Sequence, residues 1–243
     1  MNTLVIKSNF ALSAPLPGTP VMPTYDPSLM ATYDRSSVVT SDGSTVTAWK
    51  NKQGMWGSKG DLHVAKPEFP TILREAGVMF PGGTSESYMD SSLFDVPMLV
   101  GKATFLMRMR FVNNADELPC TVFSTTDPNN YVFLRRTRDQ ALTGGVSTPE
   151  IFYTPQTVPI NTWADIAFVI DGASSKVYIN DEATTVDPFR DGIEGNMPSL
   201  RLGANITGTV RLVGEISHFR VYSRAIAPDE LKEVRLSMQQ EYQ

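Results

Sequence analysis

Residues 161–186 read NTWADIAFVIDGASSKVYINDEATTV, and residues 200–226 read LRLGANITGTVRLVGEISHFRVYSRAI. In both stretches, short alternating runs are separated by turn residues such as Asp171–Gly172 and Asn180–Asp181. A period of two is the pattern of a β-strand, and Asn, Asp and Gly tolerate the backbone angles of tight turns. The two stretches therefore predict a succession of short strands joined by tight turns.

The second stretch also predicts a β-bulge. Ile216 and Phe219 both suit the buried side of one strand, but they are three residues apart, so strict alternation breaks between them. A bulge inserts one extra residue into a strand and restores the buried side beyond it. We expect this bulge near Ser217–His218.

Other segments repeat the strand pattern. Residues 103–112, ATFLMRMRFV, place Met and Phe side chains on one face and two arginines on the other. We interpret the apolar face as core and the arginines as a polar sheet face. Further strands are predicted at residues 44–50 and 77–80, and a hairpin joins residues 122–124 to residues 131–135. Repeated short strands with turn signals indicate an all-β sandwich.

The two ends of the chain differ from this pattern. Residues 1–23 contain four spaced prolines, which favour an extended arm. This arm is either a flexible terminus or an assembly arm that lies along a neighbouring subunit. The sandwich is assigned to residues 24–243, with a short amphipathic helix at about residues 228–240. Pro228 suits the first turn of that helix.

Composition narrows the classes of function. The chain has 243 residues and a net charge of −5, which argues against a nucleic-acid-binding surface. Cys120 is the only cysteine, so neither an internal disulfide nor a cysteine-based zinc site is expected. The N-terminus is too polar for a secretory signal, and no apolar run could span a bilayer. We therefore expect folding in a cytoplasm, followed by a location in a virion or outside the cell.

Several motifs resemble a known family. They are GVMFPGG at residues 77–83, the tryptophan-led strand at residues 163–167, VYIN at residues 177–180, Leu202–Gly203, and the terminal pattern at residues 214–226. Together these motifs resemble the laminin-G-like domains of the concanavalin A-like lectin/glucanase superfamily. The resemblance implies an all-β, concanavalin A-like jelly-roll β-sandwich, here with an N-terminal extended arm and a short C-terminal helix.

The matching positions are core and turn positions, so they are specific for the fold and nearly silent on a ligand. The chain departs from the family pattern at two places. Asp181 stands where the family usually has glycine, and Ser217 stands where many relatives carry an acidic residue. We assign no function to either position from the resemblance.

The sequence contains no catalytic motif that we could identify. Glycosidases of this superfamily carry paired carboxylates on one strand face, and no E-x-D-x-E triplet occurs. Asp116 and Glu117 are adjacent and would point to opposite faces of a strand. His63 and His218 lie far apart in the sequence, and we expect neither to act as a base. We predict no catalytic residues and a protein that is not an enzyme.

Carbohydrate binding needs an aromatic platform beside planar polar groups. Trp56, Tyr131 and Tyr153 are the candidates. Trp56 lies in a glycine-rich loop with little local core to fill, and the two tyrosines flank turns. We predict Trp56 as the leading ligand contact.

Calcium is an alternative in two oxygen-rich loops. Asp127 and Asn129 lie in one loop, and Asp187 and Asp191 lie in the other. Loop carboxylate and amide oxygens suit a hard cation, but Asx residues also satisfy turn backbones. We favour turn formation, so no metal site is assigned, and no other cofactor is predicted.

These features favour a non-enzymatic structural or adhesive component of an extracellular assembly. The concrete hypothesis is a bacteriophage virion protein, in capsid decoration or in the tail, that binds host-surface glycans. Its expected partners are itself or other virion proteins, contacted through the arm. A free carbohydrate-binding lectin domain and a glycoside hydrolase are the alternatives.

Overall fold

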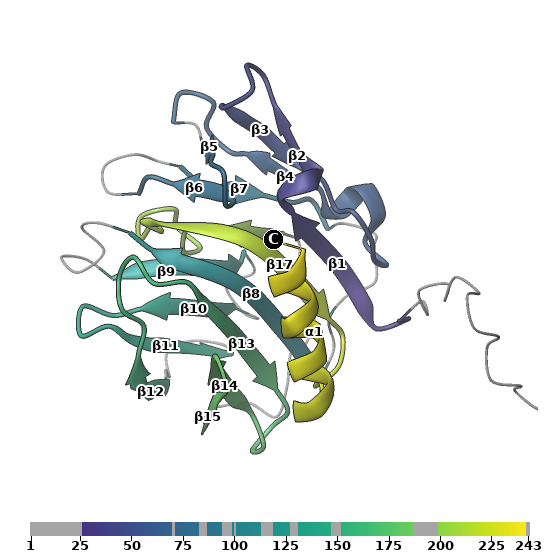
Figure 1. Ribbon diagram of the computed structural model, residues 1–243, viewed down its shortest axis with the longest axis vertical. Helices are drawn as coiled ribbons and strands as arrows, with labels where there is room; N and C mark the ends of the chain where they lie inside the picture. The colour runs from purple at the N-terminus through teal and green to yellow at the C-terminus, as the bar shows by residue number, and fades with distance from the viewer. Residues whose placement is uncertain are drawn as a thin grey trace, which may run out of the picture.

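The computed structural model describes residues 26–69, 71–82, 87–93, 99, 101–112, 119–126, 131–146, 152–186 and 199–241. Two antiparallel β-sheets pack face to face, and one helix lies across the first sheet (Figure 1). This architecture confirms the predicted concanavalin A-like β-sandwich. The predicted arm at residues 1–23 lies outside the described residues and stays a prediction.

Within the described ranges the first sheet has eight strands. Their order is β15 (Glu182–Thr185), β14 (Lys176–Ile179), β13 (Ala164–Ile170), β8 (Ala103–Phe111), β17 (Gly214–Tyr222), β6 (Val78–Phe80) and β5 (Ile72–Leu73), with β1 (Leu29–Asp34) also paired to β17.

The second sheet has nine strands in the part of the chain that the structure describes. Their order is β12 (Phe152–Thr157), β11 (Ala141–Val146), β10 (Val132–Arg136), β9 (Cys120–Thr125), β16 (Leu200–Leu202), β7 (Met89–Asp90), β4 (Leu62–Val64), β3 (Val46–Trp49) and β2 (Val38–Thr40). One edge strand of each sheet, β15 of the first and β12 of the second, is important for the site described below.

The alternation in β8 divides core from surface as predicted. Its Phe and Met side chains are fully buried between the sheets, and Phe105 stacks on Phe123 of β9 with ring centroids 4.5 Å apart. The arginines point to the outer face, where Arg108 pairs with Asp165 and Arg110 pairs with Glu215. Ion pairs with neighbouring strands thus balance the two arginine charges on the polar face of an otherwise apolar strand.

The predicted bulge in β17 is confirmed. The pairing of β17 with β8 shifts register between Ile216 and His218. On its other edge, β17 pairs first with β6 and then with β1, so it changes neighbours at the bulge. A Cβ at Gly77 would lie 2.3 Å from the Ile216 carbonyl oxygen, so only glycine permits this close approach. This change of neighbours positions one of the two hollows described below.

The helix α1 spans Pro228–Gln240, which matches the predicted range. Proline stands in its first turn, where the missing N–H leaves no intrahelical bond unmade. Leu231 and Met238 are buried against Leu106 and Tyr222 on the outer face of the first sheet. Figure 1 shows α1 in yellow, lying over this sheet with its C-terminal end near β17. None of the helices in the described ranges has the length and hydrophobicity that a membrane crossing requires.

Candidate functional site

The structure overturns the prediction for Trp56. Its side chain is only 2% exposed and belongs to the hydrophobic core between the sheets. The backbone N–H of Trp56 donates to the Met30 carbonyl at 3.0 Å, and the backbone N–H of Met55 donates to the Leu29 carbonyl at 2.9 Å. The glycine-rich loop therefore docks on β1, just before the short 3₁₀ helix η2 (Gly57–Gly60), and its tryptophan fills core. A ligand cannot stack on a ring that has no exposed face.

Tyr131 is also buried, so its ring is not available as a platform for a sugar. It is 8% exposed and stacks on Phe133, with ring centroids 4.8 Å apart. Burial raises the pKa of Tyr131 above its ordinary value, although a hydrogen bond with the Ile206 backbone acts in the opposite direction. The prediction of a ligand contact at Tyr131 is therefore wrong, because both the ring and the hydroxyl already have partners.

Tyr153 is the predicted aromatic that the fold leaves accessible. It lies on the edge strand β12 and is 61% exposed. Pro155, two residues later, is exposed as well. An exposed aromatic ring on a well-ordered strand is the kind of flat apolar surface on which the C–H face of a sugar stacks.

The local sequence explains why β12 bulges next to Tyr153. Proline has no N–H to donate to a ladder, so it is confined to edge strands and bulges. The pairing with β11 shifts between Ala141 and Thr143, and the Thr154 hydroxyl accepts the Leu142 N–H at 3.0 Å in place of a backbone oxygen. The bulge brings Gln156 to the other sheet, where its side-chain oxygen accepts a hydrogen bond from Thr184 of β15.

The hairpin of β14 and β15 forms the opposite wall. Its turn contains Asn180 at φ = 55°, a left-handed conformation that asparagine tolerates, and this confirms the predicted tight turn. The Asn180 side-chain oxygen accepts a hydrogen bond from the Asp165 backbone N–H at 3.0 Å, and the Asn180 backbone N–H donates to the Asp165 backbone carbonyl at 2.7 Å. Asp181 pairs with Arg235 of α1 at 3.3 Å. The turn is thus held by β13 and by the helix.

Between these two walls lies a hollow of about 640 Å³. We call it the edge hollow; it is lined by Pro155, Gln156, Thr157, Ile179, Asn180, Asp181 and Glu182. The carboxylate of Glu182 makes no hydrogen bond or ion pair with any residue that the structure describes. The lining therefore offers amide, hydroxyl and carboxylate groups, and the exposed Tyr153 lies on the same strand, two residues before Pro155 of the lining. Planar polar groups that converge beside an apolar surface are typical of a small-molecule site.

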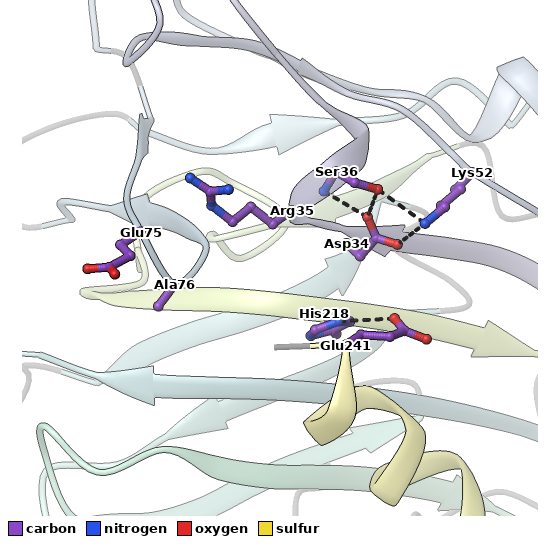
Figure 2. Close-up of a pocket in the computed structure, with 8 residues that line it drawn as sticks. All are labelled: Asp34, Arg35, Ser36, Lys52, Glu75, Ala76, His218 and Glu241. Carbon is purple, nitrogen blue, oxygen red and sulfur yellow. Dashed lines mark hydrogen bonds and ion pairs between the residues drawn. The ribbon is translucent and has the colours of Figure 1, made fainter. Parts of the chain in front are cut away.

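A second, charged hollow of about 450 Å³ lies where β17 changes neighbours (Figure 2). We call it the charged hollow; it is lined by Asp34, Arg35, Ser36, Lys52, Glu75, Ala76, His218 and Glu241. These residues come from the end of β1, the 3₁₀ helix η1 (Arg35–Ser37), two loops, β17 and the residue after α1. Figure 2 shows Asp34, Ser36 and Lys52 on one side and His218 with Glu241 on the other.

His218 is the buried group of the charged hollow. Its Nδ1 lies 2.9 Å from the Ser217 hydroxyl, and its Nε2 lies 3.3 Å from a Glu241 carboxylate oxygen. Burial lowers the pKa of His218, and Arg220 adds to this effect, whereas Glu241 acts in the opposite direction. Burial dominates because the His218 side chain is almost fully enclosed while Glu241 is screened by solvent.

The arrangement of Ser217, His218 and Glu241 has the composition of a hydrolase triad, and sequence reasoning missed the serine beside the histidine. Ser217 is fully buried, however, and its hydroxyl also lies 3.3 Å from the Arg108 carbonyl. A nucleophile must reach the reacting atom of a substrate, which this hydroxyl cannot do. The group instead fastens the end of α1 to β17.

The predicted calcium loops with Asp127, Asn129, Asp187 and Asp191 lie outside the described residues. Within the described ranges, no cluster of three or more His, Cys, Asp or Glu side chains could hold a metal ion.

Comparison with known proteins places the chain in a family. A family model described as "Concanavalin A-like lectin/glucanases superfamily", of the laminin-G-like type, matches residues 84–232. The chain therefore belongs to the laminin-G-like branch of the concanavalin A-like lectin/glucanase superfamily. A search of curated protein sequences found no match.

Several solved structures share the fold. A Trypanosoma rangeli sialidase in complex with 2,3-difluoro-KDN aligns with a TM-score of 0.66 and 10% identity, over 92% of this chain and 36% of that chain. The botulinum neurotoxin serotype D ligand binding domain in complex with N-acetylneuraminic acid aligns with a TM-score of 0.62 and 12% identity, over 86% of this chain and 51% of that chain. The CBM40 of a Ruminococcus gnavus sialidase, bound to α2,3-sialyllactose, aligns with a TM-score of 0.52 and 17% identity, over 65% of this chain and 95% of that chain. The chain spans about a third of the sialidase's length, and these likenesses show the fold.

Proposed function

We propose that this protein is a non-enzymatic, glycan-binding adhesive module that holds a sugar in the edge hollow. The observation that carries the proposal is a hollow lined by planar polar groups, one wall of which belongs to the strand that also carries the exposed Tyr153 ring. The sugar's C–H face stacks on Tyr153, while its hydroxyls bond to Gln156, Asn180 and Glu182. Three proteins that share the fold are, by their descriptions, complexes with sialic acids or sialyllactose, which supports a sugar as the ligand.

The edge hollow is preorganised for such a ligand. Gln156 is tied to Thr184, and Asn180 is fixed by two hydrogen bonds to Asp165. Because the Asn180 side-chain oxygen is already used, its amide N–H groups are the part available to a ligand. Side chains that are held before binding lose little conformational freedom when a sugar arrives, so more of the contact energy appears as affinity.

Replacing Tyr153 with alanine should weaken binding of a glycan by about tenfold or more, ~1.4 kcal/mol, because truncating an aromatic anchor removes its stacking surface. The measurement is a glycan array that identifies a binding sugar without a carboxylate, followed by titration of that sugar against the wild type and Tyr153→Ala. Tyr153→Phe keeps the ring and should bind within about threefold of the wild type, on the same estimate.

Val39→Ala provides the matched control, since Val39 is an exposed apolar residue on β2, at the opposite edge of the same sheet. It should leave the affinity unchanged. If Tyr153→Ala binds the sugar as tightly as Val39→Ala does, the edge hollow is not the site.

We further propose that the module works in an assembly, as a structural or adhesive component of a bacteriophage virion in capsid decoration or in the tail. The support is the proline-rich, partly apolar stretch at residues 1–23, which suits an arm lying along a neighbouring subunit.

On this proposal, the full-length protein self-associates, and a variant without residues 1–23 has the mass of a monomer in light scattering. The melting temperatures of the two proteins should agree, because this proposal gives the arm a role in assembly and none in the folding of the sandwich. Equal masses for the two proteins would refute the arm as an assembly element.

A further inference from the structure

We propose that the charged hollow is a second binding site, separate from the edge hollow, and that it takes a carboxylate-bearing sugar through Arg35. The edge hollow lies between β12 and the β14–β15 hairpin, whereas the charged hollow lies between β1, β17 and the end of α1. The two sites share no lining residue, so each can be tested without the other.

The charges inside the charged hollow are partly neutralised by one another. Asp34 accepts hydrogen bonds from the Ser36 N–H at 2.8 Å, the Ser36 hydroxyl at 2.6 Å and Lys52 at 2.7 Å. Burial acts to raise the pKa of Asp34, but these bonds together hold it below its ordinary value. The Asp34 carboxylate is thus ionised and already has its partners, so it does not repel an incoming anion strongly.

Glu241 is committed in the same way. One of its oxygens lies 3.3 Å from His218 Nε2, and the other lies 3.1 Å from Arg220. Two of the three carboxylates that line the hollow therefore face cationic or N–H partners. The third, Glu75, has no partner among the residues that the structure describes.

The available donors are cationic. Arg35 Nε donates to the Arg74 carbonyl at 3.2 Å, and this bond orients the guanidinium. The terminal nitrogens of Arg35 make no hydrogen bond or ion pair with the described residues, and Figure 2 shows the side chain directed away from Lys52, toward the side where Glu75 lies. Lys52 uses two of its three ammonium N–H donors, on Asp34 and Ser36, and the third has no partner among the residues that the structure describes.

An oriented guanidinium whose terminal nitrogens have no partner among the described residues fits a carboxylate through two parallel hydrogen bonds. The Glu75 carboxylate can accept hydrogen bonds from hydroxyl groups, but it would repel a second negative charge on the ligand. A ligand that satisfies both sides carries one carboxylate for Arg35 and neighbouring hydroxyls for Glu75, which is the chemistry of an acidic sugar. A hollow of about 450 Å³ is large enough for one such residue.

The experiment titrates four probes into the full-length protein: glucuronic acid, N-acetylneuraminic acid, glucose and acetate. At least one of the two acidic sugars should bind, and it should bind at least about tenfold more tightly than glucose or acetate, because only an acidic sugar has both groups. The two acids distinguish a uronic acid from a sialic acid as the source of the carboxylate. Failure of both acidic sugars, or equal binding of acetate, would overturn the proposal.

Arg35→Gln should weaken binding of the acidic sugar by about tenfold or more, since it removes a charge-assisted bidentate contact. Arg74→Gln is the matched control: it removes the same charge nearby, but the Arg74 side chain does not line the hollow. The affinity of Arg74→Gln for the acidic sugar should stay within about twofold of the wild-type affinity, because solvent and salt screen an exposed charge at a distance. Equal losses in both variants would mean general attraction and would overturn the proposal.

Tyr153→Ala separates this site from the edge hollow. It should leave the affinity for the acidic sugar unchanged, whatever it does to the glycan found on the array. Loss of acidic-sugar binding in Tyr153→Ala would place that sugar in the edge hollow and would overturn the second site. Thermal unfolding of each variant excludes loss of fold as the cause.

Discussion

Asp165→Ala should destabilise the protein by about 3–5 kcal/mol, because it removes the fully buried counter-charge that the partly buried Arg108 and the buried Arg235 share. Asp165 is fully buried on β13, and its carboxylate lies 2.9 Å from Arg108 and 3.8 Å from Arg235 of α1. Gln239 of α1 donates to the same carboxylate at 2.5 Å. One side chain therefore joins two strands to the helix, and its loss should loosen α1 from the sheet.

The measurement is urea unfolding followed by circular dichroism. Asp171→Ala is the matched control, because Asp171 follows the same strand at its other end and its partly exposed carboxylate pairs with the exposed Lys102. That variant should lose no more than about 1 kcal/mol. Comparable losses in the two variants would show that the Asp165 network does not hold the helix.

Gly203→Ala should have the second large effect and lower the free energy of unfolding by about 2–4 kcal/mol. Gly203 has φ = 86°, and a Cβ there would lie 2.4 Å from a ring carbon of Phe80. Phe80 is fully buried in the core, so the ring cannot move aside without disturbing its neighbours. Alanine would thus add overpacking, at about 1–3 kcal/mol, to the backbone strain of about 1 kcal/mol.

Gly43→Ala separates these two contributions. Gly43 has nearly the same φ, 84°, but a Cβ there meets nothing within 4 Å. It should lose only the strain, about 1 kcal/mol, in the same unfolding experiment. If both variants lose the same amount, packing against Phe80 contributes nothing to the requirement for glycine.

Much of the fold could be predicted because it depends on local patterns. Alternation located β8, the break between Ile216 and Phe219 located the bulge, and Pro228 located the start of α1. Turn chemistry identified Asn180–Asp181. Each of these features is decided by residues within a few positions of one another, so one sequence is enough to detect it.

The sites depend on contacts between distant segments, and there the predictions were less successful. Trp56 was predicted at the surface because its neighbours are glycines, but its loop docks on β1 and buries it. Tyr153 was predicted correctly as accessible, yet nothing in the sequence places its strand beside the β14–β15 hairpin. The charged hollow joins residues from Asp34 to Glu241, and no local pattern could bring them together.

The most direct test of the glycan-binding proposal is to locate the bound sugar. The sugar without a carboxylate that binds best on the array would be titrated into isotope-labelled protein, and amide shifts would be followed by NMR. We predict that the shifts concentrate in β12 around Tyr153 and in the turn at Asn180–Asp181, and that they saturate with one affinity. Saturable shifts confined to other parts of the sandwich, or no shifts at millimolar sugar, would contradict the proposal that the edge hollow binds a glycan.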